Sequence, residues 1–302
     1  MPHKPLDFIV IGAIKGGTTS LFHHLSQHPD VFLPRGKEYN FFTRDEWFER
    51  GWEWFASEYF GAANPERAWG LVTPGFMADA KAPERIAGLM PQTKLVAILR
   101  NPVDRALSEW QMTKRRGFES RGLEQALEEQ LAAPIDGARR FSAADTGSYL
   151  QRGTYARILE RYLELFPRNQ LHVMFLEDFE ARPEPTYAAL LQFLQLQPQQ
   201  VDLRRKYHEG GSRKRFPNLL KRLVRVKPLK LAWHLLPRDM RKQILLRYET
   251  DINIDRSSKA TLSPAWRSRL VGYFAEDARR LAGLGAAPPW PEFASAAVPS
   301  HK

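Results

Sequence analysis

The feature that most restricts the fold of this chain is a glycine-rich turn between a short apolar run and a helical pattern. The apolar run is Phe8–Ile11, the turn GAIKGGTTS spans Gly12–Ser20, and Leu21, Phe22 and Leu25 then recur at helical spacing. A short apolar run is typical of a strand buried on both faces. Such a strand–turn–helix unit directs backbone N–H groups and a helix N-terminus at phosphate or sulfate. The sequence therefore predicts an α/β protein with an anion-binding loop.

Further strand and helix patterns alternate along the chain. Strands are predicted at 31–33, 69–72, 95–99 and 171–176, and helices at 102–110, 155–166, 186–196 and 264–281. This alternation favours a parallel sheet covered on both faces, and 302 residues fit one large domain. We predict a single α/β domain over residues 1–285, with a central parallel sheet flanked by helices. The Ala- and Pro-rich tail at 286–302 is expected to be loose.

The turn departs from the loop of nucleotide triphosphatases at one position. In the pattern GxxxxGK[ST], Gly12, Gly17 and Thr19 match the two glycines and the last residue, but Thr18 stands where lysine is required. The lysine lies earlier, as Lys15. Because that lysine normally reaches the terminal phosphates, its relocation changes the chemistry that the loop can serve.

A displaced lysine and four further blocks resemble the sulfotransferases that use 3′-phosphoadenosine 5′-phosphosulfate (PAPS). The segment FIVIGAIKGGTTSLFHHLSQHPDV at 8–31 is similar to the family's 5′-phosphosulfate loop, and KEYNFF at 37–42 resembles the K-E-x-x-F-F of its carbohydrate, heparan-sulfate-like branch. LRNPVDRALSEWQ at 99–111 resembles the 3′-phosphate block R-x-P-x-x-R-x-x-S. The segments 175–196 and 262–285 resemble later family blocks. This resemblance, to a bacterial-type member, implies a P-loop-kinase-like sulfotransferase fold.

The resemblance also implies roles for individual residues. The donor-binding residues that it implies are Lys15, Gly16, Gly17, Thr18, Thr19, Ser20, Arg100 and Ser108. Among them, Lys15 would stabilise charge on the departing 5′-phosphate, and Arg100 and Ser108 would hold the 3′-phosphate. Glu38 matches the family glutamate that acts as general base on the acceptor hydroxyl. Lys37 either assists the sulfate or is simply solvated.

Two segments bear on how closely the family pattern is followed. Relatives often carry a charged residue, sometimes a catalytic lysine, just before an S/T-P pair, but here Leu71 and Val72 precede Thr73-Pro74. The segment HEGGSRKRF at 208–216 falls where the family closes a basic loop over the donor. The candidates for that contact are Arg213, Lys214 and Arg215.

The positive charge of the chain is concentrated in one segment. Of the formal net charge of +11, residues 204–247 carry +13 and the remainder −2. The segment around 204–248 is predicted to be helical, amphipathic and basic. Over residues 217–248 it either contacts an anionic membrane surface or caps the sheet with solvated cations. Nucleic acid is an unlikely partner, since the cations alternate with Leu and Val rather than with stacking aromatics.

The expected function is sulfuryl transfer from PAPS to a hydroxyl of a carbohydrate, glycolipid or similar small acceptor, releasing 3′-phosphoadenosine 5′-phosphate (PAP) without a metal. One alternative is a P-loop nucleoside or nucleotide kinase, for which Glu177 and Asp178 after a strand could hold magnesium. Another is a non-catalytic membrane-surface binding protein of the same fold. The chain has no cysteine, which excludes thiolate chemistry and cysteine-bound metals. Without a predicted transmembrane or signal segment, the expected location is cytoplasmic, either free or peripheral at the inner membrane surface.

Overall fold

The computed structural model describes residues 3–64, 67–132, 148–199, 201–203, 213–214, 254–255 and 260–294. The chain divides into two compact units. The first combines residues 1–206 with 262–302, and the second consists of residues 207–261. The elements below belong to the first unit unless stated otherwise.

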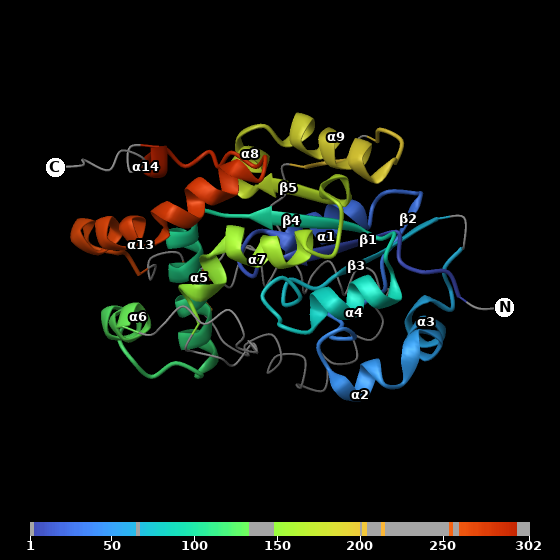
Figure 1. The fold of residues 1–302 in the computed structure, drawn as a ribbon, viewed down its shortest axis with the longest axis horizontal. Helices are drawn as coiled ribbons and strands as arrows, with labels where there is room; N and C mark the ends of the chain where they lie inside the picture. The colour runs from blue at the N-terminus through green and yellow to red at the C-terminus, as the bar shows by residue number, and fades with distance from the viewer. Residues whose placement is uncertain are drawn as a thin grey trace, which may run out of the picture. The chain divides into compact units, whose positions relative to one another are not determined.

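The first unit is built on a five-stranded sheet in which all described pairings are parallel (Figure 1). The strands are β1 (Phe8–Gly12), β2 (Val31–Phe32), β3 (Ala68–Val72), β4 (Lys94–Leu99) and β5 (Leu171–Phe175). Their order in the sheet is β2-β3-β1-β4-β5, so β1 lies at the centre between β3 and β4. The predicted central parallel sheet is confirmed, and the five strands lie where the sequence placed them to within a few residues.

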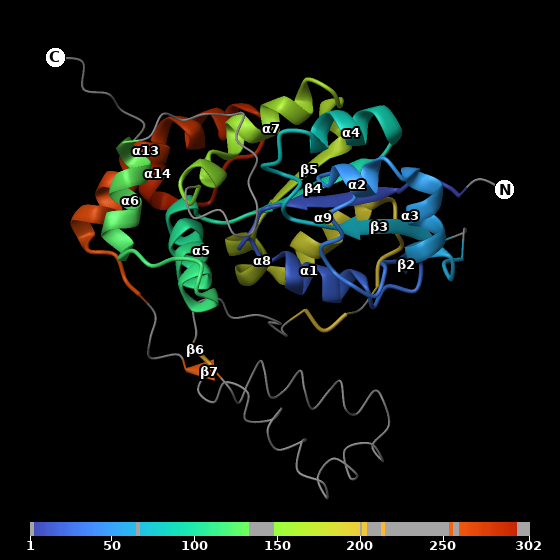
Figure 2. The same cartoon turned by 90° about the horizontal axis from the view of Figure 1, so that it is seen from below.

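Helices connect the strands and cover both faces of the sheet. They are α1 (Thr18–Leu25), α2 (Asp45–Phe48), α3 (Gly51–Phe60), α4 (Ala82–Leu89), α5 (Pro102–Arg116), α6 (Leu123–Ala132), α7 (Tyr155–Leu163), α8 (Leu176–Ala181), α9 (Pro183–Leu194), α13 (Pro264–Gly283) and α14 (Pro291–Ala294), with 3-10 turns η1 (Gln151–Gly153) and η2 (Arg168–Gln170). Figure 2 shows α4 and α7 on one side of the sheet, and α1 and α8 on the other.

Alternating side chains of each strand enter two separate cores, as a sheet buried on both faces requires. In β1, Ile9 and Ile11 pack in the core shared with α3, α4, α7 and α13. Phe8 and Val10 point to the opposite face and pack in the core shared with α1, α8 and α9. The continuous apolar run in the sequence therefore reflects burial on both sides of the sheet.

Helix α5 begins as the sequence predicted. The Asn101 side chain accepts hydrogen bonds from the N–H groups of Val103 and Asp104, and Pro102 occupies the first helical position. The helix ends at Gly117, whose φ of 79° lies in the left-handed region favoured by glycine. This start fixes the residues after β4 relative to the sheet.

The prediction of a loose tail from Ala286 is wrong for residues 286–294. Trp290 is buried, with ring centroids 5.4 Å from Phe175 and 6.1 Å from Tyr155. Glu292 accepts a hydrogen bond from Asn101 Nδ2 at 2.7 Å and forms an ion pair with Arg267 at 2.8 Å. The aromatic anchor and this ion pair outweigh the local Ala and Pro composition. Residues 295–302 lie outside the described residues.

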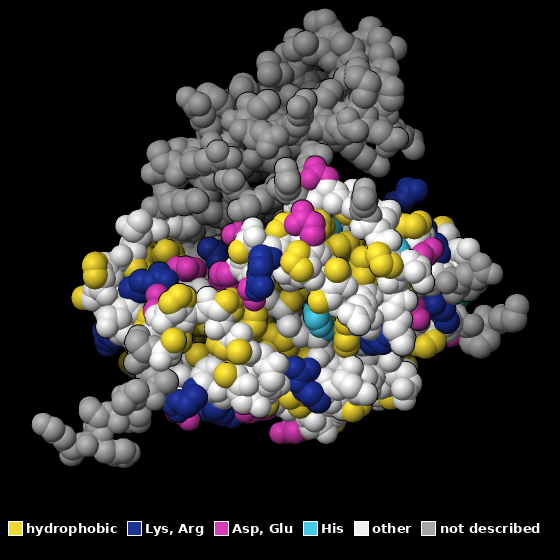
Figure 3. All heavy atoms as spheres, turned by 90° about the horizontal axis from the view of Figure 1, so that it is seen from above, with side chains coloured by type: hydrophobic (Ala, Val, Ile, Leu, Met, Phe, Trp, Pro, Cys, Tyr) yellow, Lys and Arg dark blue, Asp and Glu magenta, His cyan; other side chains and the backbone are white. Residues whose placement is uncertain are grey.

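Most of the basic segment lies outside the described residues. In the second unit, β6 (Arg213–Lys214) pairs in antiparallel fashion with β7 (Ile254–Asp255). The boundaries predicted for the domain and for the 204–248 segment remain predictions. Among the described helices, none combines the length and the apolarity needed to cross a bilayer. In the face drawn in Figure 3, Lys and Arg side chains and Asp and Glu side chains are both scattered among hydrophobic and other atoms.

Candidate active site

The glycine-rich turn lies across the carboxyl ends of β1 and β4. The Ala13 N–H donates to the Ile98 carbonyl at 2.8 Å, which ties the turn to β4. A Cβ at Gly16 would lie 2.3 Å from the same Ile98 oxygen, and Gly17 has a φ of 97°. Both glycines are therefore required by the path of the backbone.

The turn ends at a helix N-terminus that lacks a side-chain cap. Gly17 is the N-cap of α1 and supplies no capping side chain. The N–H groups of a first helical turn have no intrahelical acceptors, and the helix dipole favours negative charge there. Lys37 Nζ donates to the hydroxyls of Thr18 at 3.2 Å and Thr19 at 3.0 Å. Backbone amides, hydroxyls and an ammonium thus meet at one point, which suits an anion.

Lys15 belongs to a cluster of cations beside this turn. Its φ is 68°, in the left-handed region, so the lysine is held at the tip of the turn. Burial, followed by the charges of Arg115 and Arg100, lowers the pKa of Lys15 from 10.5 to about 8. Like charges gathered around a mostly buried lysine indicate a place for an anionic ligand.

Arg100 and Ser108 occupy the end of β4 and the first half of α5. Among the described residues, no carboxylate forms an ion pair with the Arg100 guanidinium, while its carbonyl accepts from the Tyr155 hydroxyl at 2.8 Å. Ser108 is 4% exposed, and within the described part of the chain its Oγ has no hydrogen-bond partner. A buried hydroxyl without a partner is costly. A ligand oxygen would satisfy it.

A buried ion cluster fixes the same stretch of α5. Arg105 Nη1 donates to Glu109 Oε2 at 2.6 Å, and Glu109 also pairs with Arg152 of η1. The Arg105 guanidinium also donates to the Tyr149 carbonyl. All three charged side chains are buried. Because breaking a buried pair leaves a buried charge without its partner, this cluster resists displacement of α5.

Glu38 reaches the site from the segment after β2. Its N–H donates to the Val72 carbonyl at 3.1 Å, at the end of β3, and its φ is 73°. Its side chain is 57% exposed, and its Oε1 lies 3.2 Å from Lys37 Nζ. Burial lowers the pKa of Lys37, and Glu38 acts in the opposite direction. The accessible carboxylate of Glu38 is therefore connected to the glycine-rich turn through the ammonium of Lys37.

The family model described as "Sulfotransferase domain" matches residues 5–219. The chain belongs to the sulfotransferase family. Human heparan sulfate glucosamine 3-O-sulfotransferase 6 is 32% identical over 220 residues, which cover 70% of this chain and 58% of that enzyme. The bifunctional heparan sulfate N-deacetylase/N-sulfotransferase of Drosophila melanogaster is 30% identical over 212 residues, which cover 63% of this chain and 20% of that protein. This chain therefore spans less than two thirds of these relatives.

A solved structure agrees in fold. The sulfotransferase from Alicyclobacillus acidocaldarius matches with a TM-score of 0.64 and 24% identity, covering 96% of this chain and 99% of that chain. The resemblance read from the sequence, and the sulfotransferase fold that it implied, are thus confirmed.

The structure brings most of the predicted site residues to the carboxyl edge of the sheet. Those gathered there are Lys15, Gly16, Gly17, Thr18, Thr19, Ser20, Glu38, Arg100 and Ser108. Arg213 and Lys214 form β6 in the second unit, and nothing described bears on their side chains. Arg215 lies outside the described residues. The chemical roles of all these residues remain predictions.

Sequence reasoning missed Arg115 and left Lys37 undecided. Arg115 follows Ser108 by seven residues, which is two turns of α5, so both lie on one helix face. That spacing was available in the sequence, but no family block pointed to it. The Lys37 contacts with Thr18 and Thr19 join segments 18 and 19 residues apart and could be found only in three dimensions.

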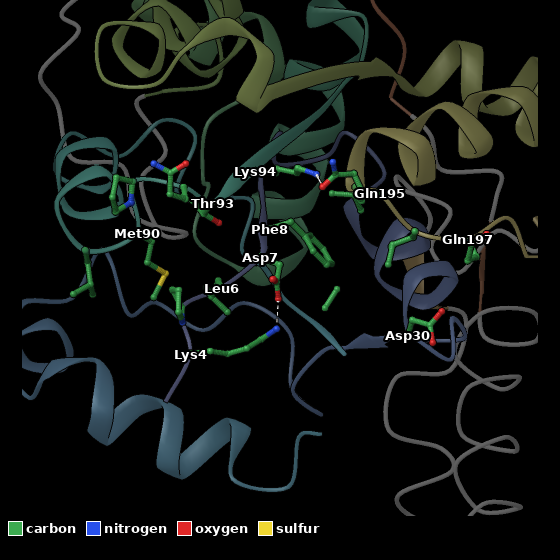
Figure 4. A pocket seen from close by; sticks show the side chains of 17 residues that line it. Lys4, Leu6, Asp7, Phe8, Asp30, Met90, Thr93, Lys94, Gln195 and Gln197 are labelled. Carbon is green, nitrogen blue, oxygen red and sulfur yellow. Dashed lines mark hydrogen bonds and ion pairs between the residues drawn. The ribbon is translucent and has the colours of Figure 1, made fainter. Parts of the chain in front are cut away.

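A pocket of about 560 Å³ lies at the opposite edge of the sheet, where β1, β3 and β4 begin. Figure 4 shows Lys4 paired with Asp7, and Lys94 paired with Gln195, among its lining residues. Lys4 and Lys94 each have a partner there, and none of the predicted site residues lines this pocket. Within the described chain, no group of three His, Asp or Glu side chains is arranged to hold a metal ion.

Proposed function

We propose that this chain transfers the sulfuryl group of PAPS to a hydroxyl of a carbohydrate, glycolipid or similar small acceptor. The observation that carries the proposal is the link between Glu38 and the donor turn. Lys37 contacts Glu38 Oε1 and the hydroxyls of Thr18 and Thr19, all within 3.2 Å. This contact sets a proton acceptor beside the place where an anionic group would bind.

The residues present suit the two ends of the donor. The turn at residues 16–19 would hold the 5′-phosphosulfate through its backbone N–H groups. Lys15 would lie against the 5′-phosphate and stabilise the charge that develops there. The unpaired Ser108 hydroxyl and the Arg100 guanidinium would hold the 3′-phosphate, with a neutral and a charged hydrogen bond.

The transfer step balances with these residues alone. The acceptor oxygen forms a new bond to sulfur, while the bond from sulfur to the 5′-phosphate oxygen breaks and its electron pair stays on that oxygen. Glu38 takes the proton of the acceptor hydroxyl as the new bond forms. Because the groups transfer in line, positioning and charge stabilisation supply most of the catalysis.

A labelling experiment tests the function directly. The protein is incubated with PAPS carrying radioactive sulfur and with N-sulfated heparan-type polysaccharide, or with fractions of a cell extract that contain glycolipids. We expect label to move to a carbohydrate-containing fraction. Glu38→Gln serves as the matched catalytic control, since it keeps shape but cannot accept a proton. Strong hydrolysis of Mg-ATP without label transfer would instead support the kinase alternative.

The relatives suggest which acceptor to try first. Two of them are named as sulfotransferases of heparan sulfate. Because Val72 replaces the charged residue that relatives often carry before Thr73-Pro74, a heparan-type acceptor is one of several to be compared.

We also propose that the basic segment at 217–248 brings the protein to an anionic membrane surface on the cytoplasmic side. The support is its charge alone, since residues 217–248 hold nine Lys and Arg side chains against one Asp. Co-sedimentation with vesicles containing anionic lipid should be strong at low salt and weak at high salt. Equal recovery with neutral vesicles would contradict the proposal.

A further inference from the structure

The side chain of Lys37 connects the two halves of the site. Its Nζ lies 3.0 Å from Thr19 Oγ1, 3.2 Å from Thr18 Oγ1 and 3.2 Å from Glu38 Oε1. A lysine ammonium has three N–H donors, so these contacts can use all of them. The side chain is only 16% exposed. Lys37 is therefore held in one position rather than solvated.

That position is electrostatically unfavourable in the ligand-free protein. A helix N-terminus favours negative charge, yet the ammonium lies on the first two residues of α1. The cations of Lys15 and Arg100 belong to the same edge. The carboxylate that Lys37 contacts is more than half exposed and therefore a weak compensation. An anion bound at the turn would compensate the charge of the ammonium.

The threonine hydroxyls can still donate hydrogen bonds to such an anion. A hydroxyl that accepts a hydrogen bond from an ammonium still has its own proton to donate. Thr18 and Thr19 can thus hold Lys37 and at the same time donate to an anion oxygen. Anion, hydroxyls and ammonium would then form one charge-assisted network.

We propose that Lys37 is a further catalytic residue, whose ammonium exchanges one threonine hydroxyl for an oxygen of the transferring sulfuryl group when the donor binds. The proposal rests on the proposed function. During the step, sulfur gains a bond to the acceptor oxygen and loses its bond to the 5′-phosphate oxygen, which keeps the electron pair. Glu38 takes the acceptor proton. Lys37 neutralises charge on the three sulfuryl oxygens throughout and holds the Glu38 carboxylate toward them.

The test compares PAPS with PAP, which differ only by the sulfuryl group. Dissociation constants for both are measured by calorimetry for the wild type, Lys37→Met and Lys37→Arg. Lys94→Met is the matched control, because Lys94 Nζ bonds Gln195 at the opposite edge of the sheet. The melting temperature without ligand shows whether each variant folds. Lys37→Gln replaces Lys37→Met if the latter does not fold.

We expect Lys37→Met to weaken PAPS binding about 10- to 100-fold, as for one lost charge-assisted hydrogen bond, and PAP binding less than about threefold. Lys37→Arg should restore part of the loss, and Lys94→Met should change neither constant. Label transfer by Lys37→Met should fall by at least the same factor.

Two results would overturn the proposal. Equal weakening of PAP and PAPS would mean that Lys37 only supports the shape of the turn. Unchanged binding of both ligands with normal label transfer would mean that it does not contact the sulfuryl group. A wild-type protein that binds neither ligand would refute the proposed function itself, which is a separate outcome.

Discussion

Replacing Ser108 by alanine should change stability and ligand binding in opposite directions. The Ser108 side chain is 4% exposed, and its Oγ has no partner among the described residues. A buried polar group left without a hydrogen bond costs about 1–3 kcal/mol. Removing the hydroxyl should therefore stabilise the ligand-free protein by about 1 kcal/mol, which raises the melting temperature by about 2–4 °C in a domain of this size. Binding of PAP should become weaker.

The loss of PAP affinity follows from the charge of the 3′-phosphate. A hydrogen bond to a charged group contributes about 1.5–3 kcal/mol, so Ser108→Ala should raise the dissociation constant about 10- to 100-fold. Calorimetric titration with PAP and a thermal scan without ligand measure the two effects on the same sample. Adenosine 5′-phosphate, which lacks the 3′-phosphate, should bind the wild type and Ser108→Ala equally.

A second serine provides the control. Ser263 caps α13, and its Oγ accepts from the Trp266 N–H at 3.3 Å. Ser263→Ala should lower the stability by about 1 kcal/mol, as for a lost N-cap, and leave PAP binding unchanged. A Ser108→Ala protein that melts lower and still binds PAP normally would refute the reasoning.

The remaining predictions concern the base, the lysine of the turn and the tail. Glu38→Gln should leave PAP binding unchanged and reduce label transfer on the order of a hundredfold, measured at saturating PAPS. Because the pKa of Lys15 is lowered to about 8, PAP affinity should fall as pH rises above 8, and Lys15→Gln should remove most of that dependence in titrations. Without ligand, the stability should rise between pH 8 and 10.5, where the unfolded chain binds more protons at Lys15. Trp290→Ala should lower the free energy of unfolding by about 3–5 kcal/mol in urea titrations, whereas a loose tail would give no change.

Much of the fold could be predicted because each strand is a local pattern. The run at Phe8–Ile11 is apolar throughout, and the structure buries it on both faces. Asn101 and Pro102 marked the start of α5 by chemistry that acts within a few residues. The tail could not be predicted in the same way. Trp290 is held by Tyr155 and Phe175, which are more than a hundred residues away in the sequence.

The site could be predicted from the sequence only where its geometry depends on residues that are close together in the chain. In the turn at residues 12–20, Gly16 leaves room for the Ile98 carbonyl and Gly17 has a positive φ, and both requirements are visible in the sequence as glycines. The Lys37 contact is different. The position of Lys37 depends on the hydrogen bond from the Glu38 N–H to the end of β3. From the sequence alone, a solvated Lys37 was therefore as acceptable as one that contacts the turn.

The balance of charge at the turn favours sulfuryl transfer over phosphoryl transfer from a triphosphate. Triphosphate chemistry depends on a magnesium ion held by protein groups to neutralise the phosphates. Here Glu177 Oε1 accepts from the Asn101 N–H at 2.8 Å and Asp178 pairs with Arg182 at 3.0 Å, so that Oε2 is the oxygen of Glu177 without a partner among the described residues. Fixed cations, Lys15 and Lys37, instead supply positive charge at the turn itself. A donor bound in this way should need no added metal, so PAP should raise the melting temperature equally with magnesium and with EDTA. If PAP raised the melting temperature only in the presence of magnesium, the result would support the kinase alternative instead.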